Sequence, residues 1–382
     1  MGDIDPARAA YAFANRFVNV VVTLPNGKPL RTAGRCGGMS FSVLDHLAAG
    51  QDVPVWPPAL FAPGTVPPDG HVVADHLKAR QLDSFRTLSA LRFLAWSVLP
   101  DRDLGPVRGV RTLTRRQLPG VLRALAQGRP VVLGLVVATN LLRAGDNHQV
   151  VATGFRRDAE GGLVLTLLDP NTPRREVTLV ETPEGWRASN GRLWRGFFHH
   201  SYARRTPPPL PSASRRPTAR VRSGAPLALA HVATGSLLVV AGGVPVLAAA
   251  GTTTWAPESG RGGLLTDGAV VRLVPIGTPG PDGDDGTAPL SLGVVDGTPR
   301  LVDSPPPRVD GTPVPVDGPS TLGTTEAPDA WRVVVDGAGP WREGSRVRLV
   351  HTTTGALLAG SPSGVRTTFD PDPSTWWTTA AH

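Results

Sequence analysis

The sequence predicts two domains of different fold class: an α+β domain over residues 1–203 and an all-β domain over residues 225–382. A chain of 382 residues is longer than one hydrophobic core ordinarily serves. Helical patterns followed by strand patterns fill the first half, and short valine-rich strands separated by turns fill the second. Between them, residues 204–224 (RRTPPPLPSASRRPTARVRSG) are rich in Pro, Ser and Arg and are predicted to form a linker.

The first domain is expected to contain three amphipathic helices and three strands. The helices cover residues 40–50, 84–100 and 114–128, and the strands cover residues 130–138, 148–157 and 161–170. Gly50 ends the first helix, because glycine adopts the left-handed backbone conformation of a helix end at little cost in free energy. Pro100 ends the second helix. Because the helices come first and short turns join the strands, we expect an antiparallel sheet packed against helices.

The second domain contains a degenerate threefold repeat. The segments LALAHVATGSLL, from Leu227, and VRLVHTTTGALL, from Val347, share the order strand, histidine, Thr-Gly turn and strand. A weaker middle copy, VRLVPIG (271–277), has Pro275 in place of the histidine. Copies that cannot bury an apolar face alone must pack on one another, so three copies predict a closed threefold arrangement.

A tryptophan follows the start of each copy, and in the middle copy it comes later because of the Pro/Gly/Asp-rich insertion at 277–289. The pattern resembles a β-trefoil, in particular the MIR type, whose repeats carry similar strands. This resemblance implies an accessory domain that binds a glycan or a protein. We interpret the repeated aromatic and histidine residues first as core residues, with a ligand-binding role as the alternative. These residues are Trp255, Trp331, Trp376, His231 and His351.

Composition and charge exclude several classes of function. Hydrophobic residues make up 40% of the chain and charged residues 18%, as in soluble globular proteins. The net charge of +8 comes without a nucleic-acid-binding motif and is interpreted as a solvated surface, so no nucleic-acid partner is expected. No apolar run is long enough to span a membrane, and the N-terminus lacks the apolar segment of a secretory signal. A cytoplasmic location is therefore expected, with export by another route left open.

The stretch GRCGGMSFSVLDHL (34–47) holds the only cysteine, Cys36. A single cysteine excludes an intramolecular disulfide and a multi-cysteine zinc site, and no cofactor or metal is predicted. Cys36 precedes the helix expected from about Ser40, and the unpaired N–H groups of a helix N-terminus stabilise a thiolate. Gly37 and Gly38 are expected to let a substrate carbonyl approach. Cys36 is therefore a candidate nucleophile; the alternative is a small buried apolar residue.

A base and an orienting acid are expected at the ends of two neighbouring strands. NHQVVATGF places His148 at the start of one strand, and LLDPN ends the next strand with Asp169. If the strands form a hairpin, these ends meet, and the carboxylate accepts a hydrogen bond from one imidazole nitrogen while the other faces the thiol. This arrangement predicts acyl transfer, with His148 as general base and acid. Asn171 is the alternative orienting group, and Asp169 alone also suits a turn.

In this order the three motifs resemble those of papain-like cysteine peptidases, closest to the C39-like branch, over residues 10–203. The resemblance implies a papain-like fold, a peptide or amide substrate and catalytic roles for Cys36, His148 and Asp169. Such families also carry an oxyanion-binding glutamine shortly before the cysteine, and this chain has no glutamine before Cys36. Asn19 is the predicted substitute donor, with Asn26 second, beside the backbone N–H of Cys36.

Three functions stay open at this point, one of them an interaction toxin or effector delivered to another cell. The first is a thiol-dependent hydrolase with an accessory binding domain. The second is a catalytically inactive scaffold with a carbohydrate- or protein-binding trefoil, which the missing glutamine favours. His46 is expected to be a packing or surface residue. His199 and His200 are not expected to bind a metal, because neighbouring residues on a strand point to opposite faces.

Overall fold

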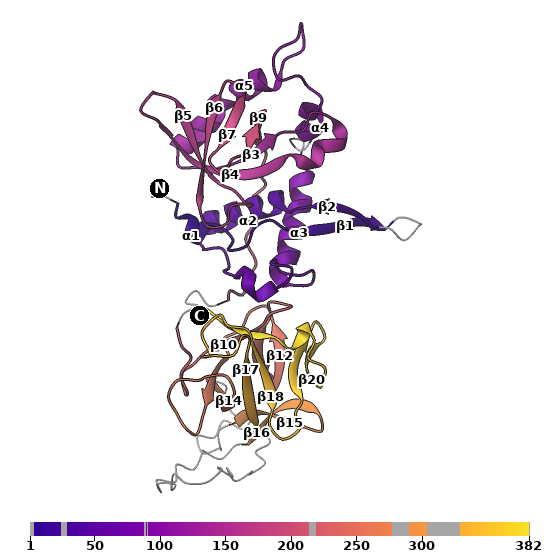
Figure 1. Cartoon of the computed structure of the whole chain (residues 1–382), viewed down its shortest axis with the longest axis vertical. Helices are drawn as coiled ribbons and strands as arrows, with labels where there is room; N and C mark the ends of the chain where they lie inside the picture. Colours follow the sequence, from indigo (N-terminus) through magenta and orange to yellow (C-terminus); the bar gives the residue numbers. More distant parts are fainter. Residues whose placement is uncertain are drawn as a thin grey trace. The chain divides into compact units, whose positions relative to one another are not determined.

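The computed structural model describes residues 4–23, 29–87, 89, 91–213, 219–276, 290–303 and 329–381. The chain divides into two compact units (Figure 1), one made of residues 1–66 and 73–208 and the other of residues 67–72 and 209–382. Within the described ranges, no helix is long and apolar enough to cross a membrane. Residues 209–224, which we expected to belong to a linker, cluster with the second unit, and Val221 is buried in its core.

The first unit is built on a seven-stranded antiparallel sheet with the order β8-β7-β6-β5-β4-β3-β9, and β1 and β2 form a separate hairpin. The strands are β1 (Val18–Thr23), β2 (Pro29–Ala33), β3 (Val131–Val136), β4 (His148–Arg157), β5 (Leu163–Leu168), β6 (Glu176–Thr182), β7 (Gly185–Ala188), β8 (Leu193–Trp194) and β9 (Gly196–His200). The helices are α1 (Pro6–Ala9), α2 (Cys36–Ala49), α3 (Val72–Phe85), α4 (Leu91–Ser97) and α5 (Val110–Ala126), with 3₁₀ turns η1 (Pro58–Phe61) and η3 (Leu141–Asp146).

Helices cover both faces of this sheet. On one face, Leu133 of β3 and Val150 of β4 share an apolar cluster with Val121 of α5. On the other face, Val136 of β3 packs with Phe93 of α4. Helix α2 lies along β4 (Figure 1). This packing brings the N-terminal end of α2 to the start of β4, where the candidate site is found.

The helical content is lower than the sequence pattern predicts. The helix expected over residues 84–100 is replaced by the end of α3 and the short helix α4, and Leu88 lies outside the described residues. Leu91 and Leu94 are exposed, so their helical spacing does not mark a core-facing stripe. In the part of the chain that the structure describes, strand makes up 36% and helix 22%. The predicted α+β, papain-like class is therefore wrong, because the structure is mostly β.

Gly37 and Gly38 allow α2 and α3 to pack closely. A Cβ atom on Gly38 would lie 2.0 Å from the carbonyl oxygen of Leu77 in α3, and one on Gly37 would lie 2.3 Å from Ser84 Oγ. Both glycines are buried. The expectation that they open a path for a substrate is therefore wrong; they are small because the neighbouring helix leaves no room for a side chain.

Replacing Gly38 by alanine should lower the free energy of unfolding by about 1–3 kcal/mol, because the added methyl group must displace backbone of α3. Gly120→Ala is the matched control: Gly120 lies in α5, and a Cβ there would meet no atom within 4 Å. This control should be neutral or stabilising, because alanine favours a helix more than glycine does. Urea unfolding of the full chain measures both effects, and equal destabilisation by both variants would contradict this account.

The second unit is entirely antiparallel in its described strands, which follow the path β12-β11-β10-β21-β18-β17-β14-β13 with β19 and β20 attached through β18, and β15 paired with β16. The strands are β10 (Ala228–His231), β11 (Leu237–Ala241), β12 (Val244–Ala248), β13 (Thr254–Glu258), β14 (Val270–Ile276), β15 (Leu290–Val295), β16 (Thr298–Asp303), β17 (Ala330–Val335), β18 (Val347–His351), β19 (Leu357–Ser361), β20 (Gly364–Thr368) and β21 (Trp377–Ala380). A 3₁₀ turn, η4 (Pro373–Thr375), precedes β21.

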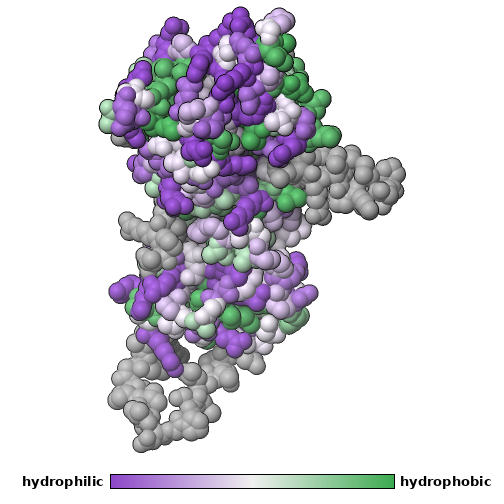
Figure 2. Space-filling model, turned by 45° about the horizontal axis from the view of Figure 1, so that its top comes forward, coloured by the Kyte–Doolittle hydropathy of each residue, from purple (hydrophilic) through white to green (hydrophobic). Residues whose placement is uncertain are grey.

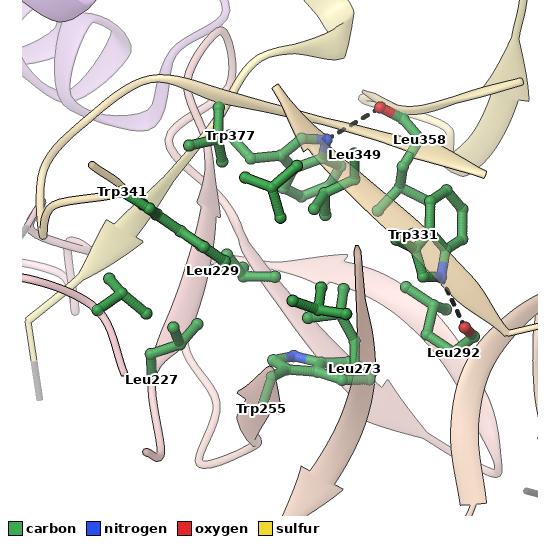
Figure 3. Packing of buried hydrophobic residues seen from close by; sticks show 14 of the residues in the cluster. Leu227, Leu229, Trp255, Leu273, Leu292, Trp331, Trp341, Leu349, Leu358 and Trp377 are labelled. Carbon is green, nitrogen blue, oxygen red and sulfur yellow. Dashed lines mark hydrogen bonds between the residues drawn. The ribbon is translucent and has the colours of Figure 1, made fainter. Parts of the chain in front are cut away.

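Three buried tryptophans repeat one set of contacts in the core of this unit (Figure 3). Each indole Nε1 donates a hydrogen bond to the carbonyl oxygen of a leucine. The pairs are Trp255 with Leu238 at 2.9 Å, Trp331 with Leu292 at 2.7 Å and Trp377 with Leu358 at 2.9 Å. Because a buried indole N–H needs an acceptor, this recurrent bond fixes each tryptophan in an equivalent place.

Strand pairing closes the threefold arrangement. Each tryptophan lies opposite the residue that begins the turn of the next copy: Trp255 opposite Pro275, Trp331 opposite His351 and Trp377 opposite His231. The last pairing joins β21, at the end of the chain, to β10, the first strand of the unit. The threefold order expected from the sequence is therefore present in the described strands, while the insertion at 277–289 lies outside them.

The third core position belongs to Trp377, and the prediction of Trp376 is wrong by one residue. Trp377 is fully buried, whereas Trp376 is half-buried, with the guanidinium of Arg348 3.9 Å from its ring centroid. Neighbouring residues in an extended chain face opposite sides, so a shift of one residue exchanges core and surface. The two tryptophans are adjacent in the sequence, and the repeat pattern alone did not show which of them occupies the core.

His231 and His351 are packing residues, which confirms their first interpretation. His231 Nδ1 lies 2.8 Å from Thr234 Oγ1, and His351 Nδ1 lies 2.9 Å from Thr354 Oγ1. Their rings pack against the core tryptophans, with centroid distances of 5.2 and 5.3 Å. The shared His-x-x-Thr spacing therefore builds the same turn twice.

Candidate functional site

Three chain segments converge at the candidate site in the first unit. Cys36 is the first residue of α2, His148 is the first residue of β4, and Asp169 follows the last residue of β5. Strands β4 and β5 are paired, with Val151 opposite Leu168, so the start of β4 lies beside the end of β5. Since α2 packs along β4, the N-terminal end of α2 lies beside the start of β4 and the end of β5.

Asp169 fixes the imidazole of His148. His148 Nε2 lies 2.7 Å from Asp169 Oδ1, and both side chains are almost fully buried. The carboxylate also accepts hydrogen bonds from the backbone N–H of Asn171 at 2.8 Å and from Asn190 Nδ2 at 2.9 Å. Trp194 stacks on the imidazole, with 5.9 Å between ring centroids. With Nε2 engaged, Nδ1 is the ring nitrogen left for the thiol.

The thiol of Cys36 interacts with the imidazole of His148, which also lines the groove. Burial by itself raises the pKa of the thiol, but the hydrogen bond and the charge of His148, with the backbone N–H groups of Gln149 and Gly37, outweigh burial and lower the pKa below its usual value. The helix starts at Cys36 itself rather than near Ser40, so the sulfur lies at the positive end of α2. These contacts all stabilise a thiolate.

The pKa of His148 is raised to about 10. Burial lowers this pKa, but the hydrogen bonds to Asp169 and Cys36 and the negative charges of both partners outweigh burial. Burial raises the pKa of Asp169, and the contacts with His148 outweigh it and hold that pKa below its usual value. These shifts favour a thiolate at Cys36, an imidazolium at His148 and a carboxylate at Asp169. The arrangement therefore favours opposite charges on the thiol and the imidazole.

The structure describes Asn15, a residue not predicted as a donor, in the same groove as Cys36, whereas the predicted donor Asn19 stays untested. Asn19 lies in β1 with its backbone opposite Thr32, and its side chain is outside the described part of the structure. Asn26 also lies outside the described residues. Asn15 lines the same groove as Cys36. The donor that replaces the missing glutamine is therefore best sought at Asn15.

Two hydrogen bonds hold Asn15 in place. Its Oδ1 accepts from the backbone N–H of Arg35 at 2.6 Å, and its own N–H donates to the carbonyl oxygen of Pro170 at 2.9 Å. Arg35 precedes the nucleophile, and Pro170 follows the acid. Because Oδ1 is engaged as an acceptor, Nδ2 is left as a donor at the groove.

An open groove of about 720 Å³ passes the thiol and the imidazole. The residues that line it include the polar Asn15, Cys36, His148 and Gln149, the apolar Phe85, Leu91 and Leu94, and also Asn171 and Arg192. The groove leaves the thiol accessible, and Cys36 is only half-buried. This placement differs from that of a cysteine enclosed in an apolar core.

The remaining predicted candidates lie near the site or away from it. Asn171 supports Asp169 and does not replace it, although Asn171 Nδ2 lies 3.2 Å from His148 Nε2. His46 is buried in α2, with Nδ1 2.8 Å from the carbonyl oxygen of Ser42, as expected for a packing residue. His199 is exposed and His200 is buried. Among the described residues, no group of three or more His, Cys, Asp or Glu side chains is placed to hold a metal ion.

Three polar residues of the site were missed from the sequence. Asn15 lies in an irregular segment with no motif around it. Asn190 lies in the turn after β7 and reaches Asp169 only through the folded sheet. Gln149 follows His148 directly, so its closeness to the base was the one available signal.

Comparison with known proteins leaves the family open. No family model and no curated protein matches the chain. Solved structures that match include the SDF2-like protein from Arabidopsis thaliana, which is 17% identical with a TM-score of 0.30; the match covers 42% of this chain and 95% of that chain. The S. cerevisiae protein O-mannosyltransferase Pmt1-Pmt2 complex bound to the sugar donor is also 17% identical with a TM-score of 0.30. That match covers 44% of this chain and 26% of the other chain. A Caenorhabditis elegans protein of unknown function matches with 14% identity, 43% and 97% coverage and a TM-score of 0.29.

Proposed function

We propose that the first unit is a thiol-dependent hydrolase that transfers an acyl group through Cys36, with an amide or peptide bond as the expected substrate. The observation that supports this best is the hydrogen-bonded series of Cys36, His148 and Asp169 beside an open groove. A buried structural cysteine would need neither a charged imidazole nor an access route.

The reaction follows from the charges of these groups. The Cys36 thiolate attacks the substrate carbonyl carbon, and a C–S bond forms while the carbonyl oxygen takes the electron pair. When the tetrahedral intermediate collapses, the C–N bond breaks and the imidazolium of His148 gives its proton to the departing amine. His148 then takes a proton from water, the resulting hydroxide attacks the thioester, and the carboxylic acid leaves as the C–S bond breaks.

Two side chains serve the reacting groups in different ways. Asp169 is a positioning residue, because it holds His148 through Nε2 and stabilises the imidazolium without contacting the substrate. Asn15 is proposed to donate from Nδ2 to the oxyanion, together with the backbone N–H of Cys36. Each partner is held by the fold before the substrate binds, which reduces the reorganisation needed in the transition state.

The proposal predicts a burst of 4-nitrophenol when the full chain is mixed with 4-nitrophenyl acetate. One acetyl group should form on each chain and should be located on Cys36 by mass spectrometry, since thioester formation precedes hydrolysis. The Cys36→Ala variant should give neither burst nor adduct. A wild-type chain with no burst and no acetylated Cys36 would overturn the proposal and favour the inactive binding scaffold.

A further inference from the structure

Part of the groove lining, called the apolar wall below, consists of the large exposed side chains of Phe85, Leu91 and Leu94. Phe85 at the end of α3 and Leu91 and Leu94 of α4 are 58%, 60% and 49% exposed. Figure 2 shows hydrophobic patches between the hydrophilic parts of the surface of this unit. Apolar side chains gathered at a concave site are stabilised when a ligand covers them. This wall therefore needs an apolar occupant.

The apolar wall adjoins the nucleophile, whereas a basic side chain adjoins the base. Ser84, the residue before Phe85, packs against Gly37 beside the nucleophile. Arg192 also lines the groove, and its guanidinium lies 4.9 Å from the ring centroid of Trp194, which stacks on His148. In thiol-dependent acyl transfer the acyl group stays on sulfur and the amine leaves with the proton from histidine. The apolar wall is thus placed to contact the acyl part of the substrate.

Gln149 adds a polar contact at the same place. Its side chain lines the groove and is 2% exposed, and Oε1 has no hydrogen-bond partner among the described residues. A buried acceptor without a partner is costly, and an N–H donor on a bound ligand would satisfy it. The groove therefore combines an apolar wall with an unused acceptor close to the sulfur.

We propose that the groove selects acyl donors that carry a large apolar substituent next to the scissile carbonyl and an N–H that donates to Gln149. This inference rests on the proposed hydrolase function. The apolar substituent contacts Phe85, Leu91 and Leu94, and its source is either an amino-acid side chain or an aliphatic acyl chain. A pocket of this kind discriminates by about 10- to 200-fold in kcat/KM.

The test compares 4-nitrophenyl esters of acetate, octanoate, N-benzyloxycarbonyl-leucine and N-benzyloxycarbonyl-aspartate. The leucine ester should acylate Cys36 at least about tenfold faster than the aspartate ester. A faster octanoate ester would assign the pocket to an aliphatic chain, and a faster leucine ester to an amino-acid side chain. N-methylation of the leucine ester should slow acylation if Gln149 accepts its N–H.

Variants on the wall and beside it locate the selectivity. Phe85→Ser and Leu94→Ser should reduce the leucine-to-aspartate ratio about tenfold. Leu82→Ser should leave the ratio unchanged, because Leu82 is 51% exposed on the same helix α3 but does not line the groove. Equal rates with both esters, or an equal effect of Leu82→Ser, would overturn the inference while acetylation still supports the hydrolase. Failure of every ester to acylate Cys36 would overturn the hydrolase itself.

Discussion

The His148→Ala variant is expected to react with iodoacetamide at about pH 5.5 roughly a hundredfold more slowly than the wild-type chain. Without the imidazolium, the hydrogen bond and charge that most lower the pKa of Cys36 are lost while burial still raises it, so the thiolate fraction at this pH falls. The lower intrinsic nucleophilicity of a low-pKa thiolate offsets part of this difference. The rate of alkylation, followed by mass spectrometry, is the measurement.

His199→Ala is the control for this variant. His199 is exposed in β9 and lies outside the groove lining, so its removal should leave the alkylation rate unchanged. If His148→Ala alkylates as fast as wild type, the contact between the imidazole and the sulfur does not activate the thiol. Circular dichroism of both variants shows whether the fold is retained.

The Asn15→Ala variant is expected to lower kcat for ester or amide hydrolysis by about 10²- to 10³-fold, because one oxyanion donor is removed. Alkylation by iodoacetamide should change little, since displacement of iodide develops no oxyanion. The loss of the acceptor for the Arg35 N–H should also lower the free energy of unfolding by about 1 kcal/mol. Kinetics and urea unfolding on the same preparation separate the two effects.

Asn19→Ala distinguishes the two asparagines. Asn19 was the donor expected from the sequence, whereas Asn15 is the one that lines the groove with Cys36. A loss of kcat in Asn19→Ala with none in Asn15→Ala would contradict the assignment. An oxyanion donor produces a specific pattern: wild type and Asn15→Ala are alkylated at equal rates, and kcat is reduced only in the variant.

The proximity of His148 and Asp169 was predictable because strand ends constrain both residues. His148 begins a strand and Asp169 ends its neighbour, so antiparallel pairing alone brings the two side chains together. Cys36 precedes a strong helical pattern, which placed it at a helix N-terminus. In each case a local pattern and one pairing rule were sufficient.

Other features depend on contacts that no local pattern records. Asn15 is positioned by Arg35 and Pro170, which are far from it in sequence. Gly38 looked available to a substrate because the sequence does not show that Leu77 of α3 packs on it. The predicted helix over residues 84–100 failed because apolar spacing does not distinguish a core-facing stripe from an exposed wall of a groove.

The central claim is that the imidazolium of His148 lowers the pKa of Cys36 and stabilises its thiolate. A pH titration of the ultraviolet thiolate absorbance, taken as wild type minus Cys36→Ala, tests it most directly. The account predicts that the thiolate appears at lower pH than that of an ordinary thiol, since the pKa of Cys36 is lowered, and that His148→Ala moves its appearance to higher pH. A single ionisation at or above the usual thiol pKa, unchanged in His148→Ala, would contradict the account.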